Sequence, residues 1–555
     1  MEFTKPTIEY ATLWPLLVVF GVAVVGVLFE AFLPRERRFV AQSVLAVLGL
    51  LVALGGTAYV WTQLDEIRVD GQGVVARGEL AAGQTLAVDG PTIFLWGLVL
   101  LFSIAGVLLF AERRLEGGVS TFAGQAAALP GSEAEREAST RGLHHTEVYP
   151  LLMFAVGGMM LFPTANDLLT MFVALEVLSL PLYLMCGLAR RRRLLSQEAA
   201  LKYFLLGAFS SGFFLYGAAL VFGYAGSMQF ADISEAVRNG TGNNALLLIG
   251  MGLLAVGLLF KVGAVPFQAW TPDVYQGAPT AVTAFMAACT KIAAFGALLR
   301  LFYVAFGAER WDWQPMLWVI AILTMLAGAI LAAVQTDVKR MLAYSSVAHT
   351  GFLLVGVLGV RSAGAVGTDE ITALQSVLFY LATYAPATVG TFAIVTLVRD
   401  AGGEATAFSK WAGLGQRSPL VAGAFGFLLL SMAGIPLTGG FVGKWSVFTV
   451  AMAAGAWPVV LVAIVASIIS VFFYVRVILL MFFSDDDTSE VTDAETGWGA
   501  GTVTATLERV ETAAVTKPSL LTSGTIAVCV LLVVLLGLVP GPILDLAGDA
   551  GQFIR

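Results

Sequence analysis

Five ionisable side chains stand in the middle of long uncharged runs of this 555-residue sequence. Lys261 occurs in LLFKVGAVPFQAW, residues 258–270, and the sixteen residues before it carry no charge. The other four are Glu176 in FVALEVLSLPLYL, Lys291 in AACTKIAAFGALL, His349 in YSSVAHTGFLLVG and Lys444 in SMAGIPLTGGFVGKWSVF. A charged side chain at the centre of a bilayer costs about 2.5–3.5 kcal/mol on insertion scales, so each of the five is expected to face protein and to have a function.

Lysine suits proton transfer because burial disfavours its charged form and lowers its pKa. A nearby carboxylate raises that pKa again, so a carboxylate that moves toward or away from a lysine makes the lysine bind or release a proton. Glu176 needs a counter-ion, and a lysine on a neighbouring helix can supply it. Several buried lysines linked by water, with His349 between them, therefore predict a proton relay across the middle of the membrane. A carrier for sugars or amino acids is expected to have more polar and aromatic ligands for its substrate.

Alternatives stay open for Lys261, for His349 and for a further ionisable residue, Lys202. Lys202 follows Glu198 by four residues near the start of its helix, so a surface i,i+4 pair explains it almost as well as a relay role. His349 can be a packing residue as readily as a relay residue. The helix of Lys261 can end at the lysine, whose ammonium then reaches the interface. That helix would have about sixteen residues, short for a span, so the buried position is favoured.

The composition predicts that these residues are positioned by membrane helices. The chain is 58% hydrophobic and 12% charged, whereas soluble proteins have about 25% charged residues. Apolar runs of roughly 20 residues, the length of a spanning helix, occur near 13–33, 39–61, 91–110, 147–165, 166–189, 198–225, 245–272, 279–303, 315–334, 337–360, 370–399, 420–454, 457–482 and 521–541. They lack strict two-residue alternation, so we predict an all-α polytopic membrane protein with about fourteen transmembrane helices.

Two of the predicted spans contain helix-breaking residues beside a lysine. In the seventh, Pro266 follows Lys261, and in the twelfth the sequence before Lys444 contains Pro436, Gly439 and Gly440. Interrupted helices in corresponding positions point to an inverted-repeat transporter. The two spans are five apart in chain order. Because a unit of five helices has an odd number of spans, a second copy of it enters the membrane from the opposite side. We therefore predict inverted repeats of helices 4–8 and 9–13, with helices 7 and 12 discontinuous.

The glycines of the twelfth span suggest a further property of the Lys444 site. Glycine has no side chain to block a close approach. Gly439, Gly440 and Gly443 are therefore expected to let backbone and water reach the Lys444 ammonium.

The apolar runs divide the chain into six segments. They are 1–110 with three spans, the polar cytoplasmic loop 111–146, the first repeat 147–303, the inverted second repeat 315–482, the acidic cytoplasmic loop 483–520, and the last span and tail 521–555. The acidic residues gathered in 131–147 and 485–511 are expected to be solvated and not to form a metal or partner site.

The distribution of basic residues predicts the orientation in the membrane. Loops after odd-numbered helices hold eighteen Lys and Arg, among them Arg190 to Arg193, Lys339 and Arg340, against eight on the other side with both termini. The positive-inside rule then puts both termini on the outer, periplasmic side, with an even number of helices.

Motifs for cofactors are missing from the sequence. Cys186, Cys289 and Cys529 lie in apolar runs without metal-ligand or iron–sulfur spacing and are expected to be buried hydrophobic residues. No G-x-G-x-x-G or Walker sequence opens a strand–helix unit. We therefore expect no redox cofactor, metal or nucleotide in this chain, and no nucleic-acid partner.

From about residue 90 to 485 the chain resembles the antiporter-like membrane subunits of respiratory complex I, the proton-pumping NADH:quinone oxidoreductase. The resemblance rests on ALEVLSLPLYL, EAALKYFLLGAFSSGFFLYG, LLFKVGAVPFQAWTPDVYQGAPT, SSVAHTGF and AGIPLTGGFVGKW. That family comprises subunits L, M and N, with relatives in multisubunit sodium/proton antiporters. Lys444 is similar to subunits L and N, since M has a glutamate there. Nothing after residue 485 resembles the lateral helix of L, and EAALKYFLLGAFSSG is most similar to N. The loops 111–146 and 484–520 are longer than that subunit leads us to expect.

The resemblance implies roles for individual residues. Glu176 and Lys261 correspond to a coupling ion pair on the fifth and seventh helices, and Lys202 to a residue that modulates this pair. Lys291 corresponds to the central relay residue.

For the remaining residues the resemblance implies that His349 bridges two half-channels and that Lys444 releases the proton or passes it on. It also implies a multi-pass subunit of the cell membrane that couples NADH oxidation and quinone reduction to proton pumping. Other complex I membrane subunits would be its partners, and NADH, FMN, iron–sulfur clusters and quinone would bind to partner subunits. The alternatives are a subunit of a sodium/proton antiporter complex, complex I subunit M or L, or an accessory subunit that only scaffolds.

Overall fold

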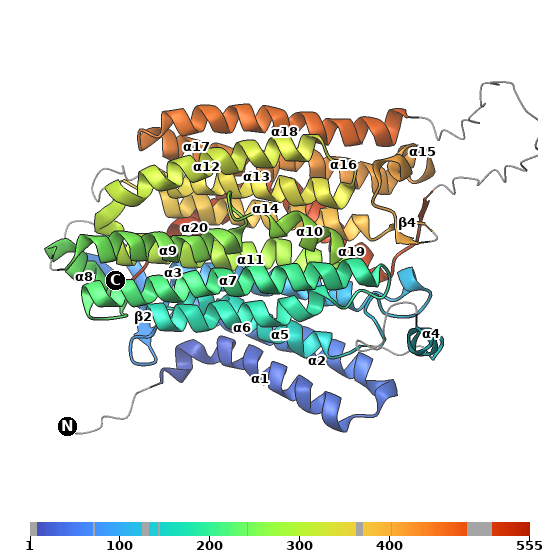
Figure 1. The fold of residues 1–555 in the computed structure, drawn as a ribbon, viewed down its shortest axis with the longest axis horizontal. Helices are drawn as coiled ribbons and strands as arrows, with labels where there is room; N and C mark the ends of the chain where they lie inside the picture. Colours follow the sequence, from blue (N-terminus) through green and yellow to red (C-terminus); the bar gives the residue numbers. More distant parts are fainter. Residues whose placement is uncertain are drawn as a thin grey trace, which may run out of the picture.

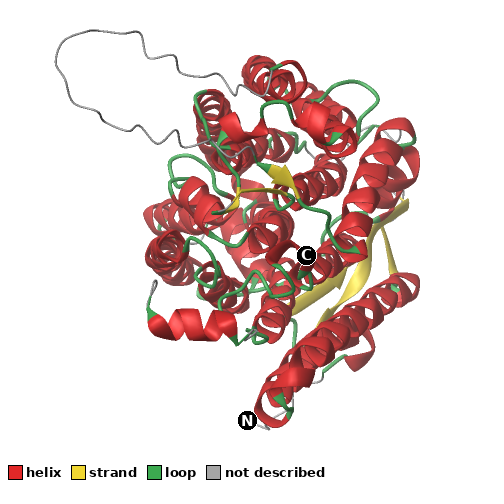
Figure 2. Cartoon of the chain, turned by 90° about the vertical axis from the view of Figure 1, so that its right-hand side faces the viewer, coloured by secondary structure: helices red, strands yellow, loops and turns green. Residues whose placement is uncertain are grey.

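The computed structural model describes residues 8–69, 73–124, 132–141, 145–240, 242–361, 370–400, 402–484 and 513–554. Long helices run side by side along one direction (Figure 1), and most of them are seen end-on when the bundle is turned by 90° (Figure 2). The acidic segment 485–511, assigned to a loop from the sequence, lies outside the described residues.

The N-terminal part contains three long helices and a small sheet that the sequence analysis did not predict. In chain order its elements are α1 (Tyr10–Phe32), α2 (Arg35–Gln63), β1 (Glu66–Val69), β2 (Gly73–Ala81), β3 (Leu86–Asp89), α3 (Gly90–Phe110), a 3-10 turn (Arg114–Glu116) and α4 (Glu133–Thr140). The strands form an antiparallel sheet in the order β1-β2-β3. Asp89 ends β3 and caps α3, because its carboxylate accepts from the backbone N–H of Thr92.

The first predicted repeat covers the next group of helices. They are α5 (Val148–Thr164), α6 (Leu168–Cys186), α7 (Arg193–Ala225), α8 (Phe230–Asn239), α9 (Asn244–Val262), α10 (Trp270–Gly277) and α11 (Thr280–Arg300), which continues as a π-helical turn (Leu301–Ala305).

The second predicted repeat and the C-terminal part follow. Their elements are a 3-10 turn (Gly307–Glu309), α12 (Arg310–Ala333), α13 (Val338–Val357), α14 (Ala373–Val395), β4 (Val398–Asp400), β5 (Gly403–Glu404), a 3-10 turn (Phe408–Trp411), α15 (Leu414–Arg417), α16 (Pro419–Ala433), α17 (Gly439–Ala453), α18 (Trp457–Phe483), β6 (Ala514–Val515), α19 (Leu520–Leu538) and α20 (Gly541–Asp549). The short strands pair antiparallel in the order β5-β4-β6.

The apolar runs of the sequence coincide with helices. Among the described residues, eleven helices are long and apolar enough to cross a membrane, and α5 and α16 are shorter apolar helices. α11 and α14 are buried along their whole apolar windows, whereas most residues in the apolar windows of α1, α2 and α19 are exposed or only partly buried. The multi-pass helical membrane fold is therefore confirmed, with α11 and α14 at its centre, while the count of about fourteen spans stays a prediction.

Two pairs of contacts recur 170 positions apart and support the predicted repeats. Asp167 caps α6 through the N–H of Thr170, and Asp337 caps α13 through the N–H of Arg340. A Cβ at Gly158 of α5 would meet the backbone nitrogen of Leu178 at 2.4 Å. In the same way, a Cβ at Gly328 of α12 would meet the backbone nitrogen of Ala348 on α13 at 2.4 Å. The pair α5–α6 and the pair α12–α13 therefore each come into close contact at a glycine.

Candidate functional site

The seventh predicted span is divided into α9 and α10. Gly263, at a φ of 75°, ends α9 and donates its N–H to the carbonyl of Phe260, as glycine does at left-handed helix C-caps. Residues 263–269, which include Pro266, are not helical. Neighbours satisfy the freed backbone: Val265 donates to the Thr324 hydroxyl of α12 at 3.0 Å, and the Trp270 indole donates to the Phe260 carbonyl at 3.0 Å. Such a break is tolerated in a membrane where protein surrounds it.

Lys261 lies in the last turn of α9 and is only 4% exposed. Its ammonium is 5.4 Å from the ring centroid of Tyr183 on α6 and 5.3 Å from that of Tyr203 on α7. The two rings meet edge to face, with centroids 4.6 Å apart. The ammonium is therefore held by cation–π contacts inside the protein, and the alternative in which it reaches the interface is wrong.

Glu176 of α6 lies near Lys261 without touching it. It lies close enough to Lys261 and to Tyr183 for an electrostatic interaction with each of them. Its Oε1 atom is buried and has no hydrogen-bond partner. In the described part of the chain the two residues form no ion pair. Tyr183 contacts the ammonium of Lys261, and Oε1 of Glu176 stays without a hydrogen-bond partner.

Lys291 occupies the centre of the bundle on α11. It is 3% exposed, and its ammonium donates to the carbonyl and hydroxyl of Ser346 at 2.6 and 2.8 Å and to the hydroxyl of Thr350 at 2.8 Å. The Thr350 hydroxyl in turn donates to the carbonyl of Val262 at 2.7 Å. Val262 is the last residue of α9, so one hydroxyl connects Lys291 to the helix break beside Lys261.

His349, on the same helix as Ser346 and Thr350, is surrounded by tyrosines. Its Nδ1 is 2.8 Å from the hydroxyl of Tyr380 on α14, and its Nε2 is 3.4 Å from the hydroxyl of Tyr474 on α18. Tyr384 links the imidazole to Lys291, because its ring lies 5.2 Å from that of His349 and its hydroxyl is 2.8 Å from the Ser346 hydroxyl. His349 is therefore part of a polar network and not a simple packing residue.

Lys444 lies in α17, the second half of the other broken helix. It is 4% exposed and donates to the carbonyl of Ala433 at 2.8 Å and to the hydroxyl of Ser467 on α18 at 3.0 Å. Its ammonium is 4.7 Å from the ring centroid of Phe352, whose ring lies 5.8 Å from that of His349. The ring of Phe352 thus contacts both His349 and Lys444.

Two of the glycines of this break are packed against neighbouring helices, while their expected role of letting backbone and water reach Lys444 stays a prediction. The non-helical residues are 434–438, which include Pro436, whereas Gly439 and Gly440 belong to the first turn of α17. A Cβ at Gly440 would meet the carbonyl oxygen of Ser431 at 1.9 Å, so this glycine is required for close packing of α17 on α16.

Gly443 is likewise a packing residue, since a Cβ there would meet the ring of Tyr380 at 2.4 Å. Gly434, which the sequence analysis did not single out, borders the lysine instead. Gly434 has a φ of 87°, and a Cβ added there would meet Cδ of Lys444 at 3.0 Å.

Lys202 lies outside this buried row. Its side chain is 42% exposed and pairs with Glu198 at 2.8 Å, the i,i+4 alternative considered above. It also pairs with Asp273 of α10 at 2.7 Å, and Asp273 pairs with Arg340 of α13 at 2.9 Å. Asp273 was missed because a carboxylate near a predicted loop has no distinctive sequence signal.

Two further basic residues were misjudged from the sequence. Arg300, counted at a helix end, is fully buried and pairs with the equally buried Asp89, its Nη2 lying 2.7 and 2.8 Å from the two carboxylate oxygens. Lys339, counted with the surface loops, is also buried. Both stand near the ends of apolar runs, where sequence does not distinguish a buried charge from a solvated one.

The described residues contain no group of three or more His, Cys, Asp or Glu side chains that could hold a metal ion. The cysteines Cys186, Cys289 and Cys529 are buried and unpaired. Cys186 and Cys289 lie on α6 and α11 and Cys529 on α19, in agreement with their interpretation as small hydrophobic residues.

Comparison with known proteins gives consistent results. Residues 165–470 match the protein family described as NADH:quinone oxidoreductase/Mrp antiporter, TM. NADH-quinone oxidoreductase subunit N of a Nocardioides species is 70% identical over 555 residues, all of both chains, and the subunit N of Rhodococcus opacus is 54% identical, covering 99% of this chain and 97% of the relative.

Solved structures resemble the fold over almost its whole length. A chain of respiratory complex I from Thermus thermophilus has a TM-score of 0.71 at 31% identity, covering 97% of this chain and all of that one. A chain of the Mrp complex from a Dietzia species has a TM-score of 0.73 at 19% identity, covering 98% and 97% of the two chains. The latter identity is too low to indicate more than a shared fold.

Proposed function

This chain belongs to the family of NADH-quinone oxidoreductase subunit N, the antiporter-like proton-translocating membrane subunits of complex I, and we propose that its buried row of ionisable residues carries the protons. The relatives at 70% and 54% identity are both subunit N, which favours this assignment over the alternatives of subunit M or L and of a sodium/proton antiporter subunit. The other membrane subunits of the complex are its partners.

One observation carries the proposal. Lys261, Lys291 and Lys444 are all buried, and none forms an ion pair with a carboxylate in the described part of the chain. An unpaired buried ammonium is costly, and such groups inside membranes are typical of ion and proton pathways. Their actual partners are hydroxyls, carbonyls and aromatic rings, which allow an amine to gain or lose a proton without breaking a strong ion pair.

The residues have distinct roles in this proposal. Glu176 controls the charge of Lys261 by approaching or leaving it, which its unpartnered Oε1 permits. Lys291 exchanges the proton along the hydroxyls of Thr350 and Ser346, and His349 with its tyrosines passes it to Lys444. Lys202 influences the first pair only through its electrostatic field, since it is exposed.

We further propose that NADH, FMN, iron–sulfur clusters and quinone bind to partner subunits, and that the redox step reaches this chain through its contacts with them. The missing nucleotide and cluster motifs support this division of labour.

The proposed orientation places both termini outside the cytoplasm. The N-terminal end of α1 and the last helix α20 lie at the same end of the bundle as the C-terminus (Figure 1). β4 and α15 lie at the opposite end. The eighteen basic residues of the loops after odd-numbered helices support a cytoplasmic location for that opposite end.

The proposal is tested by Lys291→Ala in the assembled complex, reconstituted into vesicles. The variant is expected to assemble and to lose both proton pumping and NADH:quinone reductase activity, because electron transfer stalls when protons cannot move. Normal pumping by assembled Lys291→Ala complex would contradict it. Loss of reductase activity without assembly would point to a scaffold, which a native gel of the membrane complex detects.

A further inference from the structure

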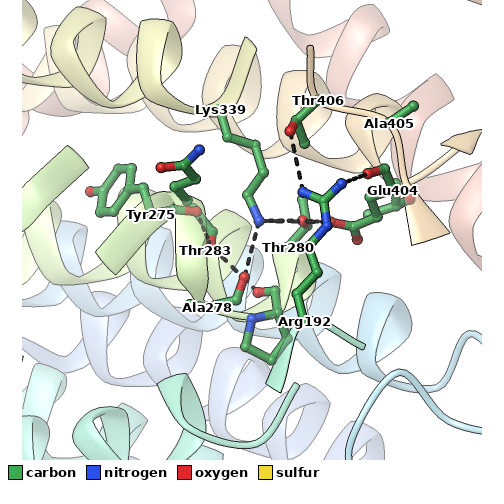
Figure 3. A network of polar contacts seen from close by, with 12 residues as sticks. Arg192, Tyr275, Ala278, Thr280, Thr283, Lys339, Glu404, Ala405 and Thr406 are labelled. Atoms are coloured by element: carbon green, nitrogen blue, oxygen red, sulfur yellow. Dashed lines mark hydrogen bonds and ion pairs between the residues drawn. The ribbon is translucent and has the colours of Figure 1, made fainter. Parts of the chain in front are cut away.

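Lys339 is a fourth buried lysine, outside the row that the family resemblance identifies. It is the second residue of α13 and its side chain is 3% exposed, although it stands at the end of the bundle where the basic loops lie. Figure 3 shows its side chain extending from α13 toward the turn between α10 and α11. Its ammonium donates to the carbonyl of Ala278 at 3.0 Å and to the hydroxyl of Thr280 at 2.8 Å.

A hydroxyl connects this lysine to a carboxylate. Thr280 accepts from Lys339 and donates to Oε2 of Glu404 on β5. The ammonium and this carboxylate oxygen are 3.7 Å apart. An amine, one hydroxyl and a carboxylate in this order form a proton-transfer chain of two hydrogen bonds.

The carboxylate end of this chain is accessible to water. The side chain of Glu404 is 20% exposed, and its backbone carbonyl accepts from the exposed Arg192 at 2.9 Å (Figure 3). Arg192 also donates to the hydroxyl of Thr406, which itself donates to Asp337, the N-cap of α13. Glu404 therefore has a water-accessible carboxylate beside basic side chains, at one end of the hydrogen-bonded chain.

The lysine end of the chain stands on the helix that also carries the partners of Lys291. Positions 339, 346 and 350 fall on one face of α13, because seven and eleven residues correspond to about two and three helical turns. Ser346 and Thr350 bind Lys291. Tyr275 of α10 is close to both parts of this region, because its carbonyl accepts from Thr283 at 3.2 Å and its side chain lies near that of Ser346.

We propose that Glu404, Thr280 and Lys339 form the uptake site through which protons reach Lys291 from the side of the basic loops. The inference rests on the proposed proton-translocating function and adds its source of protons. The step begins with Lys339 as a neutral amine and with a Glu404 carboxyl that has taken a proton from the bulk solvent. Glu404 gives this proton to the Thr280 oxygen, and at the same time the Thr280 hydroxyl gives its own proton to Nζ of Lys339. The result is an ammonium and a carboxylate bridged by a hydroxyl, which is the arrangement observed.

A purely structural lysine makes a different prediction. Lys339 also satisfies the carbonyl of Ala278, the residue that follows α10, and a cation stabilises a helix C-terminus in any case. Arginine supplies the same charge and more donors but is always protonated. A structural cation tolerates Lys339→Arg, whereas a proton carrier does not.

The test measures proton pumping and quinone reductase activity of assembled complex in vesicles for Lys339→Arg, Lys339→Met, Thr280→Val and Thr280→Ser. We expect Lys339→Arg, Lys339→Met and Thr280→Val to lower both activities by about tenfold or more, and Thr280→Ser to keep most of them because its hydroxyl remains. Arg476→Lys is the matched control, since Arg476 donates to the last carbonyl of α12, that of Ala333, but is exposed.

The outcomes separate this inference from the function on which it rests. Wild-type pumping by Lys339→Arg, or equal losses in Thr280→Ser and Thr280→Val, would overturn the uptake site even if Lys291→Ala is inactive. Wild-type pumping by Lys291→Ala would overturn the proposed function itself. If Lys339→Met fails to assemble, Lys339→Arg and the two threonine variants still decide between the outcomes.

Discussion

The ammonium of Lys444 donates a 2.8 Å hydrogen bond to the carbonyl of Ala433, although the two residues belong to different halves of the broken helix. Ala433 is the last residue of α16, so the cation sits at a helix C-terminus, where the helix dipole stabilises positive charge. At the other break the terminal carbonyl of α9 accepts from Thr350, which accepts from Lys291. Each break thus presents a helix C-terminus to a lysine, directly or through one hydroxyl.

Substitution of Lys444 distinguishes a proton carrier from a fixed cation. Lys444→Arg keeps the charge but does not release a proton at physiological pH, so it is expected to impair pumping nearly as much as Lys444→Ala. Lys444→Glu is expected to retain part of the activity, because a carboxylate also binds and releases a proton. The measurement is proton pumping by assembled complex with each variant. Full activity of Lys444→Arg would mean that the site is electrostatic scaffolding.

Gly434 is predicted to be the glycine of the second break whose substitution disturbs Lys444 directly. Its positive φ costs another residue about 1–2 kcal/mol, and an added Cβ would press on Cδ of Lys444 at 3.0 Å. Gly434→Ala should therefore lower the thermal stability of the complex and its pumping rate. Gly212→Ala on α7 is the control, since nothing lies within 4 Å of its added Cβ. Equal behaviour of the two variants would show that the Gly434 geometry is not required.

Thr350 is predicted to be needed for its hydroxyl. Thr350→Val leaves the Val262 carbonyl without this donor, at a cost of about 1–3 kcal/mol, and removes one of the three hydrogen-bond acceptors of Lys291. Pumping should fall in Thr350→Val and be largely retained in Thr350→Ser.

The control for Thr350 is Thr391→Val on α14, where the hydroxyl bonds the Ala387 carbonyl of its own helix. Loss of pumping in Thr391→Val as large as in Thr350→Val would indicate that any buried hydroxyl matters equally.

Much of the site was predictable, because burial in a membrane leaves a clear mark in sequence. A lysine inside an uncharged run followed by Pro266 predicts both a buried charge and a broken helix, and both are present. The short-range contacts were not predictable. Whether Glu176 touches Lys261 or stays apart depends on how α6 and α9 are placed by α7, against which both pack. The choice of Ala433 as the partner of Lys444 depends on how the chain folds back at 434–438.

Residues near the ends of apolar runs were harder to interpret. Lys339 and Arg300 have the sequence context of interfacial anchors, yet each is buried against groups far away in the chain. Arg300 finds Asp89 and the tail residue Phe553, whose ring centroid lies 4.5 Å from its guanidinium. Such partners come from the tertiary arrangement and have no local signal.

The Arg300–Asp89 pair is predicted to hold the bundle together at the end opposite the basic loops. Arg300 also donates to the carbonyl of Pro163, and Asp89 accepts from the backbone of Ile554, so the pair joins α11, α3, α5 and the C-terminal tail. Removal of one partner from a buried ion pair costs about 3–5 kcal/mol. Arg300→Gln is therefore expected to reduce the amount of assembled complex on native gels. Arg141→Gln, which breaks an exposed i,i+4 pair with Glu137, should leave assembly unchanged.

The central claim is that the buried row carries protons and that Glu176 controls Lys261. The most direct test is the simultaneous measurement of proton pumping and NADH:quinone reductase activity in vesicles containing assembled complex with Glu176→Ala or Lys261→Ala. Both activities are predicted to fall together in both variants, because tight coupling stops electron transfer when protons cannot move. Normal pumping by either assembled variant would contradict the claim.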